Sequence, residues 1–359
     1  MSLHDQYMQR CLSLARKGAG RVAPNPLVGA VLVCNDRIIG EGWHEVYGGP
    51  HAEVNCIHSV AENDKDLIEQ STLYVSLEPC SHFGKTPPCT DLIIKYDIPK
   101  VVIACRDPFI EVNGKGIERL RDAGVEVITG ILEKEAIDCN KRFFTFHTRQ
   151  RPFIILKWAQ TADGWMGKKA GDRLLISNEY TNRLVHQWRG EEAAILVGTQ
   201  TALADNPALT NRLSPGANPI RLVIDRNLQL PAGLQVFDGA VKTIVFNTLK
   251  QEKSEHLLFY KLGDEKNLLP QILQALYDMK ILSVMVEGGA HTLQSFIDSG
   301  CWDEIRIIKS AAPAPAFLNN DEGIAAPLLP ASTHISHEKI LSDNIDIYTN
   351  PHSTSFSAS

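Results

Sequence analysis

Two different spacings of apolar residues divide the first 147 residues into predicted helices and strands. Apolar side chains recur at helical spacing through residues 5–18, and a second helical pattern covers residues 51–60. Between them, the stretch LVGAVLVCNDRIIGEGWH predicts two strands joined by a turn at Asn35 and Asp36. The next segments predict strand, helix, strand, helix and strand in turn: TLYVSLE, CTDLIIKYDI, KVVIACRD, GIERLRDAG and VEVITG. This order predicts a sheet whose strands are joined by crossovers and covered by helices.

A second series of strands follows residues 141–152, a basic and aromatic segment without a clear period. We place a domain boundary in this segment and expect domains 1–147 and 148–359. The later strand patterns are PFIILKWAQ, AAILVG, PIRLVID, KTIVFN, ILSVMVEGG, DEIRIIKSA and NIDIYT, with a helix predicted at 290–299. The pattern therefore predicts two α/β domains in tandem, which a length of 359 residues also favours.

Composition limits the classes of function. Hydrophobic residues make up 44% of the chain and charged residues 22%, which suits two ordinary globular cores. No apolar run approaches the roughly 20 residues that cross a bilayer. A net charge of −6 disfavours a large nucleic-acid surface but is compatible with a small phosphorylated substrate. We expect a cytoplasmic protein with a small-molecule substrate and neither a nucleic-acid nor a membrane partner.

The stretch LEPCSHFGKTPPC holds Cys80 and Cys89 in a loop rich in proline. Two cysteines in this position form a disulfide, are unrelated buried thiols, or bind a metal ion with ligands from elsewhere. The disulfide is the weakest of the three, because eight scattered cysteines in a chain of this size are typical of a reducing compartment.

The stretch HAEVNCI adds His51 and Glu53 at the start of a predicted helix. Zinc deaminases of nucleobases use one histidine and two cysteines as ligands, in the pattern H-x-E followed by P-C-x-x-C, and a glutamate that does not bind the metal. Here the second cysteine follows the first by nine residues rather than three. The pattern predicts that Glu53 takes a proton from a zinc-activated water and passes it to the leaving ammonia. A structural zinc site with Cys56 or His58 as fourth ligand is the alternative.

Four segments, PNPLVGAVLV, GEGWHEVYGGPHAEV, LYVSLEPCSHFGKTPPC and DPFIEVNGKGI, together resemble the first half of the bifunctional deaminase/reductase family of riboflavin biosynthesis. The resemblance implies a cytidine-deaminase-like, three-layer domain with one zinc ion per chain. Its implied zinc ligands are His51, Cys80 and Cys89, and its implied general acid/base is Glu53. Substrate contacts are implied for Asn25, His82, Lys85 and Thr86.

The second domain contains no G-x-G-x-x-G fingerprint, so its sequence gives no support to a Rossmann fold. Instead, ILKWAQTADG, AILVGTQTALADNPALTNR, RLVID and MVEGGAHTLQSF resemble the reductase half of the same family. This implies a dihydrofolate-reductase-like fold that binds NADPH. The residues implied for catalysis are Lys157 and Asp205, and those implied for substrate binding are Arg173, Arg189, Leu209, Arg212 and Glu287. The residues implied for cofactor binding are Ala159, Leu175, Thr201, Asp205, Gly289, Ala290, His291, Thr292, Leu293, Gln294 and Ser295.

One segment departs from the family pattern. The chain has Arg173, Leu174, Leu175, Ile176 and Ser177 where the family usually has Ser-x-Trp-Ile-Ser/Thr, so a flat packing surface beside the cofactor is missing. The implied overall reaction is deamination of 2,5-diamino-6-(5-phosphoribosylamino)pyrimidin-4(3H)-one, followed by reduction of the ribosyl to a ribityl side chain. We expect a homo-oligomer, either a dimer or a tetramer. Two alternatives remain open: a nucleoside or nucleic-acid deaminase with an unrelated second domain, and a non-catalytic zinc module with a binding domain.

Overall fold

The computed structural model describes residues 2–83, 87–109, 112–169, 174–263, 266, 268–312 and 322–353. The chain divides into two compact units, residues 1–150 and residues 151–357. Among the described residues, no helix is both long and apolar enough to cross a membrane.

The first unit is built from short helices and strands that largely follow the predicted order. Its elements are α1 (Leu3–Ala15), η1 (Arg16–Gly18), β1 (Gly29–Cys34), β2 (Arg37–Trp43), α2 (Ala52–His58), η2 (Glu62–Gln70), β3 (Thr72–Val75), α3 (Cys89–Lys95), β4 (Lys100–Ile103), α4 (Lys115–Asp122), β5 (Glu126–Thr129), α5 (Glu133–Cys139) and α6 (Lys141–Arg149). The predicted turn at Asn35 and Asp36 is confirmed, and both residues have the positive φ angles, 48° and 59°, that a tight hairpin turn requires.

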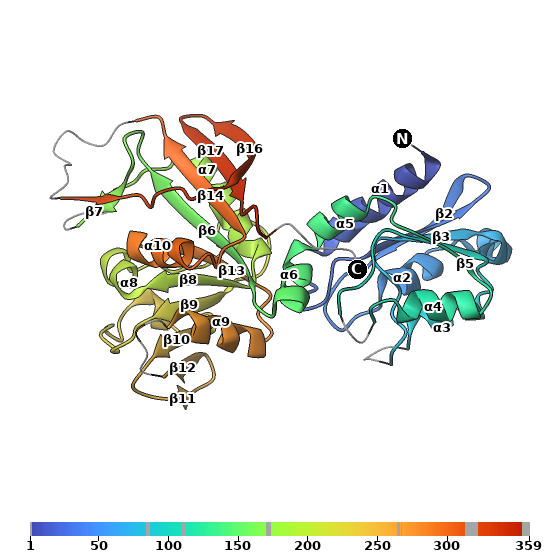
Figure 1. The fold of residues 1–359 in the computed structure, drawn as a ribbon, viewed down its shortest axis with the longest axis horizontal. Coiled ribbons are helices and arrows are strands. Elements are labelled where there is room, and N and C mark those ends of the chain that lie inside the picture. Colours follow the sequence, from blue (N-terminus) through green and yellow to red (C-terminus); the bar gives the residue numbers. More distant parts are fainter. Residues whose placement is uncertain are drawn as a thin grey trace. The chain divides into compact units, whose positions relative to one another are not determined.

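Within the described residues, the first unit has one five-stranded sheet in the order β2-β1-β3-β4-β5. The β1–β2 and β1–β3 pairs are antiparallel, whereas β3, β4 and β5 run parallel. Helix α1 packs on β1, β3 and α5, while α2 packs on β1, β2 and α3, and α4 on α3 and β5. Figure 1 shows α1 and α5 on one side of this sheet and α2, α3 and α4 on the other. The predicted three layers are therefore present.

Helix α6 differs from the sequence expectation. No helix or strand was predicted for residues 141–152, which lack a clear period, but Lys141–Arg149 form a helix. Its buried side chains are Phe143, Phe144, Thr145 and Phe146. Phe143, Phe144 and Phe146 lie on one face of this helix, so an amphipathic pattern is present but extends over only nine residues, too few for the period to stand out in the sequence.

The second unit is organised around a larger sheet. Its elements are β6 (Phe153–Gln160), β7 (Trp165–Lys168), α7 (Glu179–Glu191), β8 (Ala194–Gly198), α8 (Thr199–Asp205), β9 (Ile220–Ile224), η3 (Gln235–Phe237), β10 (Thr243–Asn247), β11 (Glu252–Lys253), β12 (Leu257–Lys261), α9 (Leu269–Asp278), β13 (Ser283–Gly288), α10 (Ala290–Asp298), β14 (Glu304–Ser310), β15 (Gly323–Ala325), β16 (Thr333–Ile340) and β17 (Asp343–Thr349).

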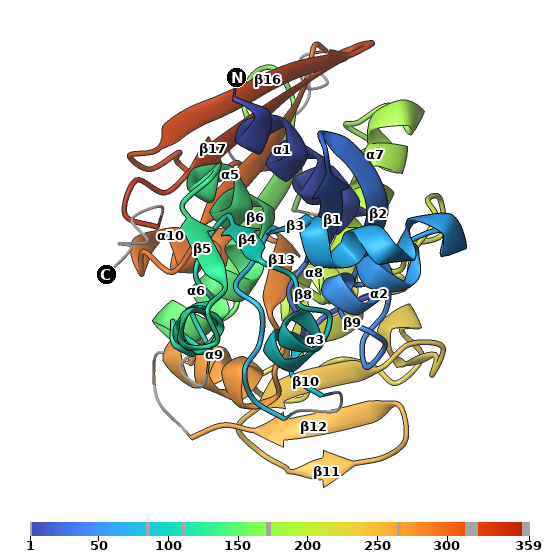
Figure 2. The same ribbon diagram turned by 90° about the vertical axis from the view of Figure 1, so that its right-hand side faces the viewer.

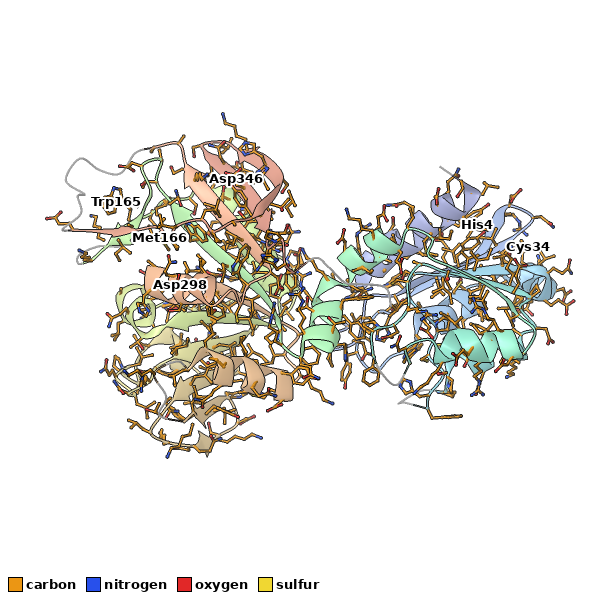
Figure 3. The ribbon with its side chains drawn as sticks, in the orientation of Figure 1. His4, Cys34, Trp165, Met166, Asp298 and Asp346 are labelled. Atoms are coloured by element: carbon orange, nitrogen blue, oxygen red, sulfur yellow. The ribbon has the colours of Figure 1, made fainter. Side chains whose placement is uncertain are left out.

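Among the described residues, ten of these strands form one sheet in the order β11-β12-β10-β9-β8-β13-β6-β14-β17-β16. The strands from β12 to β14 run parallel, and the outer pairs are antiparallel. Figure 2 shows β10, β12 and β11 side by side at one edge. Strand β7 pairs with β15 in a separate small sheet, and Figure 3 labels Trp165 and Met166 on this strand.

Side chains of β6 alternate between two cores, one on each face of the large sheet. Ile154, Leu156 and Trp158 belong to the core that also contains side chains of α9 and α10. Phe153 and Ile155 belong to the opposite core, together with side chains of α7 and α8. Because successive strand residues point to opposite faces, Lys157 lies on the α7 side, at the carboxyl end of β6. The carboxyl ends of parallel strands are the usual position of a ligand site in such sheets.

Candidate metal centre and cofactor site

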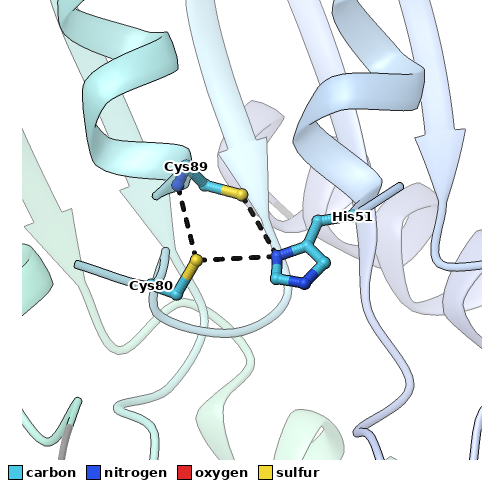
Figure 4. Close-up of side chains that lie close together, drawn as sticks. All are labelled: His51, Cys80 and Cys89. Atoms are coloured by element: carbon cyan, nitrogen blue, oxygen red, sulfur yellow. Dashed lines mark hydrogen bonds between the residues drawn. The ribbon is translucent and has the colours of Figure 1, made fainter. Parts of the chain in front are cut away.

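Three side chains of the first unit converge on one point. His51 is the N-cap of α2, Cys80 lies in the loop after β3, and Cys89 is the first residue of α3. The His51 Nδ1 atom lies 3.5 Å from the Cys80 Sγ atom and 3.3 Å from the Cys89 Sγ atom, as Figure 4 shows. All three atoms lie within 4.8 Å of one another.

These separations fit a tetrahedral zinc ion. With zinc bonds of about 2.3 Å to sulfur and about 2.05 Å to nitrogen, a tetrahedral angle separates nitrogen from sulfur by about 3.6 Å. The observed 3.3 Å and 3.5 Å are close to that value. The backbone N–H of Cys89 also donates to the Cys80 Sγ atom over 3.4 Å, which stabilises a thiolate there. The donor set and its spacing therefore suit zinc.

The other sequence interpretations of the cysteines are less well supported. All eight cysteines lie within the described residues, and none forms a disulfide. Cys56 is fully buried in the apolar core, and neither it nor His58 belongs to the cluster of metal-ligand side chains found in the described residues. Three protein ligands leave the fourth position of a tetrahedral ion to water, which is typical of catalytic zinc sites.

The two thiols have unequal acidity without a metal ion. Hydrogen bonds from Cys89 and from His51 lower the pKa of Cys80 to about 4. The same shared proton, together with burial, raises the pKa of Cys89 well above its ordinary value. The hydrogen bond to Cys80 raises the pKa of His51. The cluster thus contains one deprotonated thiol, that of Cys80. Binding of a divalent cation would displace the remaining protons.

Glu53 lies beside this cluster in α2, with only 3% of its surface exposed. Burial raises the pKa of its carboxyl group, although the charge of His51 opposes the change. A carboxyl group whose pKa is raised by desolvation is suited to accepting and returning a proton near neutral pH.

A hydrogen-bonded chain fixes the orientation of Asn25. The His44 Nδ1 atom lies 2.9 Å from the Pro50 carbonyl oxygen, which only accepts, so the proton is on Nδ1. The His44 Nε2 atom therefore accepts from the Asn25 Nδ2 atom at 3.0 Å. The amide oxygen of Asn25 is thereby directed away from His44. His44 was not predicted as a site residue from the sequence, although it stands in the GEGWHEVYGGPHAEV motif.

His82 lies in the loop between the two cysteines and contacts an aromatic cluster. Its ring centroid is 6.1 Å from that of Phe109, which in turn lies 5.1 Å from that of His147 in α6. The His82 Nδ1 atom is buried and has no hydrogen-bond partner in the described part of the chain. Lys85 and Thr86, two further implied substrate contacts, lie outside the described residues.

A second charged cluster lies in the second unit, where β6 and β13 end side by side. Leu156 is paired with Val286, so Lys157 and Glu287 follow on the same face. Glu287 accepts two hydrogen bonds of 2.7 Å from the Arg189 Nε and Nη2 atoms. A third Arg189 donor, Nη1, is 3.1 Å from the Thr210 carbonyl oxygen. Most of the Arg189 guanidinium is therefore engaged within the protein.

Arg212 and Leu209 lie in the segment after α8. The Arg212 side chain is exposed, and its backbone N–H donates to the His186 Nδ1 atom over 3.1 Å. His186 is buried, and burial followed by the charges of Arg189 and Arg212 lowers its pKa to about 4. Leu209 is buried with a φ angle of 48°, so its backbone rather than its side chain is available to a ligand. The sequence analysis missed His186.

The implied cofactor residues gather around the start of α10. The Thr201 hydroxyl group accepts the Gly289 N–H over 2.7 Å, which joins the first turn of α8 to the turn before α10. Gly288 has a φ angle of 150°, which only glycine adopts readily. A Cβ atom on Gly198 would lie 2.5 Å from the Thr292 Oγ1 atom, so the first turn of α10 packs closely on the end of β8. The glycine-rich turn and helix start are suited to a phosphate group.

Other implied cofactor residues are spread over several environments. Ala159 is half-buried on β6, and Asp205 is the half-buried last residue of α8. Ala290, Thr292 and Gln294 are half-buried, His291 and Ser295 are exposed, and the Leu293 side chain is buried in the core. Leu175 is exposed, and Arg173 lies outside the described residues. The structure thus brings Thr201, Gly289 and Thr292 together, but it does not bring Leu175 into a described contact with them.

Comparison with known families assigns each unit. Residues 1–105 match the cytidine and deoxycytidylate deaminase zinc-binding region, and residues 152–314 match the RibD C-terminal domain. The chain is 43% identical to a riboflavin biosynthesis protein RibD of Aquifex aeolicus, over 87% of both chains. It is 39% identical to RibD of Bacillus amyloliquefaciens, over 89% of both chains.

Solved structures are similar over nearly the whole chain. A diaminohydroxyphosphoribosylaminopyrimidine deaminase/5-amino-6-(5-phosphoribosylamino)uracil reductase from Thermotoga maritima has a TM-score of 0.85 and 38% identity, and the match covers 97% of this chain and 98% of that one. RibD of Acinetobacter baumannii has a TM-score of 0.84 and 28% identity, with the same coverage. The predicted fold class, a cytidine-deaminase-like domain followed by a reductase domain, is confirmed.

Proposed function

This chain belongs to the RibD family of riboflavin biosynthesis proteins, bifunctional enzymes with a deaminase and a reductase domain, and we propose how its residues divide the two reactions. The first unit, residues 1–147 in the proposed division, hydrolyses 2,5-diamino-6-(5-phosphoribosylamino)pyrimidin-4(3H)-one to 5-amino-6-(5-phosphoribosylamino)uracil and ammonia. The second, residues 148–359, reduces the ribosyl side chain of that product to ribityl. The observation that supports the first assignment most strongly is the His51–Cys80–Cys89 cluster beside the buried Glu53.

In the deaminase unit, His51, Cys80 and Cys89 hold zinc and Glu53 moves protons. When bound, zinc lowers the pKa of a water molecule to about 7 and so supplies the nucleophile. Glu53 accepts a proton from that water and delivers it to the amino group that leaves as ammonia. Its burial keeps bulk water away from the transfer and supports this role.

Asn25 binds the pyrimidine ring. Because His44 accepts from its Nδ2 atom, the Asn25 amide oxygen is fixed as an acceptor for ring or exocyclic N–H groups of the substrate. His82 offers a buried, unpaired ring nitrogen among the described residues, which would gain a partner when substrate binds. We assign the substrate phosphate to Lys85 and Thr86, by resemblance alone.

In the reductase unit, Arg212 is the candidate cationic contact of the substrate phosphate. Arg189 was also expected to bind substrate, but its three hydrogen bonds within the protein favour positioning Glu287 as its main task. Glu287 then serves as an acceptor for ribose hydroxyl groups, while Leu209 contributes its backbone. Lys157 and Asp205 are the candidates for proton transfer near the sugar.

We infer that the nucleotide cofactor is NADPH, bound around Thr201 and the start of α10. The nicotinamide supplies the hydride, and the protein fixes its distance and orientation to the sugar. The Gly289 N–H is donated to Thr201, so the N–H groups at residues 290–292 are the ones suited to the cofactor diphosphate. The arrangement that supports this inference is the Thr201–Gly289 contact at the carboxyl ends of β8 and β13. Ala159 and residues 293–295 complete the proposed contact list.

A coupled assay tests both halves. Purified protein is supplied with the phosphoribosyl pyrimidine and NADPH, and ammonia release and NADPH absorbance are followed together. We expect both signals in the wild type, and in Glu53→Gln we expect loss of ammonia release by a factor of about 10² to 10⁴ with zinc retained. The reductase rate of this variant on the deaminated intermediate should equal that of the wild type. Ammonia release from Glu53→Gln at the wild-type rate would refute the assigned base.

The same assay separates the competing functions. Ammonia release from cytidine or tRNA, with none from the phosphoribosyl pyrimidine, would support a nucleoside or nucleic-acid deaminase. Absence of NADPH binding would support a non-catalytic second domain. We further infer a cytoplasmic enzyme, because free thiols throughout the chain suit a reducing compartment. We also propose that it is a homo-oligomer, either a dimer or a tetramer. Sedimentation of the purified protein tests the oligomeric state.

A further inference from the structure

The carboxylate of Glu78 joins the segment just before Cys80 to the start of α4. Glu78 follows β3 by three residues and has 4% of its surface exposed. Among the described residues, its Oε2 atom accepts the N–H groups of Asp107 at 3.3 Å and Gly114 at 2.9 Å. Its Oε1 atom accepts those of Gly116 at 2.9 Å and Ile117 at 3.3 Å. One side chain therefore satisfies four buried backbone donors.

Two glycines at the start of α4 allow the backbone of this helix to come close to Glu78. Gly114, the N-cap residue of α4, has a φ angle of 86°, a conformation that favours glycine. A Cβ atom on Gly116 would overlap the carbonyl oxygen of Pro79 and lie 3.1 Å from the Glu78 Oε1 atom. The first turn of α4 thus lies directly on the Glu78–Pro79 backbone. An anionic side chain at a helix start is also favoured by the helix dipole.

The bond pattern excludes two other tasks for Glu78. Each carboxylate oxygen has two lone-pair positions, and the four N–H groups occupy all of them. No position remains to bind a metal ion or to exchange a proton with substrate. The Glu78 side chain therefore acts only through the backbone that it holds.

Two parts of the candidate deaminase site depend on that backbone. Cys80 is two residues beyond Glu78, on the carbonyl side of Pro79. In the other direction, Asp107 uses its Oδ1 atom to accept the Phe109 N–H over 2.8 Å, and the Phe109 ring contacts that of His82. Glu78 thus lies between one metal ligand and one wall of the proposed substrate site.

We propose that Glu78 is a positioning residue of the deaminase, which fixes Cys80 against segments 107–109 and 112–117 and thereby controls zinc retention and substrate affinity. The proposal rests on the zinc-deaminase function proposed above. In the Glu-Pro-Cys stretch, Cys80 is the proposed metal ligand and Glu78 holds the backbone that carries it. The two roles should be separable by experiment.

The test is Glu78→Gln, which keeps the shape of the side chain. The amide retains an acceptor for one pair of N–H groups and presents a donor to the other pair. Zinc release from the loaded protein to a chromogenic chelator should be about 10 to 100 times faster than from the wild type, the usual effect of losing a group that orients a metal ligand. The deaminase KM should rise about tenfold, whereas reductase turnover on the deaminated intermediate should stay within twofold.

The matched control is Ile68→Ala. Ile68 is a buried core residue of η2. Among the described residues, no hydrogen bond joins it to the metal ligands or to α4. Its truncation destabilises the same unit through a cavity. Zinc release at equal distance below each melting temperature should be fast in Glu78→Gln and near the wild-type rate in Ile68→Ala.

Three results would overturn the proposal. Equal zinc release from Glu78→Gln and Ile68→Ala would show that Glu78 contributes only to the general stability of the unit. Wild-type zinc release and wild-type KM in Glu78→Gln would exclude any positioning task. If Glu78→Gln does not fold, Glu78→Asp replaces it, since its charge is kept and its reach shortened by one methylene, and wild-type zinc release there has the same meaning. Wild-type protein that binds no zinc would instead refute the proposed function.

Discussion

The buried Arg189–Glu287 pair allows a quantitative prediction for the second unit. The two side chains are 12% and 7% exposed and share two hydrogen bonds of 2.7 Å. Glu287→Gln keeps the volume but leaves the Arg189 cation without its counter-charge. Removing one partner of a buried ion pair costs about 3–5 kcal/mol.

The acidity of Glu287 gives an independent magnitude. Burial alone would raise its pKa, but the charges of Arg189 and Lys157 outweigh burial and lower the pKa from 4.5 to about 2. At about 1.4 kcal/mol per pH unit, this difference is about 3 kcal/mol of stability. Because the folded pKa is the lower one, this stability is complete above pH 4.5 and is lost as the pH falls towards 2. At pH 3.5 about 1 kcal/mol should already be lost.

Urea unfolding measured by tryptophan fluorescence tests both numbers. Four of the five tryptophans, Trp158, Trp165, Trp188 and Trp302, lie in the second unit and report on it. At pH 7 the unfolding free energy of Glu287→Gln should be about 3 kcal/mol below that of the wild type, and at pH 3.5 the gap should narrow to about 2 kcal/mol. The control Glu338→Gln, at an exposed position of β16 in the same unit, should change the unfolding free energy by less than about 0.5 kcal/mol. A difference in unfolding free energy between the wild type and Glu287→Gln below about 1 kcal/mol at pH 7 would refute the reasoning. A difference that grows as the pH falls would refute it as well.

Substitutions at three further positions test the sites. His44→Leu removes the acceptor that orients Asn25, so the deaminase KM should rise about tenfold with zinc content unchanged, and an unchanged KM in the ammonia assay would contradict this. Gly42→Ala would force a Cβ atom into the backbone of α2, so we expect a lower zinc content by metal analysis, and full zinc occupancy would show that α2 can yield. His186→Leu leaves the Arg212 N–H without its acceptor and should raise the reductase KM, whereas His186→Asn, which offers an oxygen near the Nδ1 position, should recover most of the loss when NADPH oxidation is followed.

The metal cluster could be predicted from sequence because zinc restricts its ligands to a few residue types. His51, Cys80 and Cys89 stand at helix starts or in the loop between a strand and a helix, and their side chains meet although the Cys–Cys spacing is unusually long. The five described strands of the first unit and seven strands of the second were also predicted, because apolar runs and turn residues are local signals. Strands β7, β11, β12, β15 and β16 were missed, and most of their residues are polar or half-exposed. The chemical requirements of a metal ion therefore leave a set of residue types that can be recognised in the sequence.

The supporting residues could not be predicted in this way. Glu78 bonds to backbone groups 29 to 39 residues away, and nothing in the residues beside it indicates those partners. His186 is one polar residue in an ordinary helix, and its role depends on a loop 26 residues further along the chain. Helix α6 was not predicted, and the expected boundary between residues 147 and 148 falls inside it, whereas the compact units meet at residues 150 and 151.

Two glycines of β2 allow the main chain of α2 to approach the strand. A Cβ atom on Gly40 would lie 2.6 Å from the Cys56 carbonyl oxygen, and one on Gly42 would overlap the Cys56 backbone nitrogen. The side chains of Ser59 and Val60, just after the helix, also meet Gly40. Any residue larger than glycine at either position would therefore push α2 away from the strand, and His51 and Glu53 at the start of that helix would move with it.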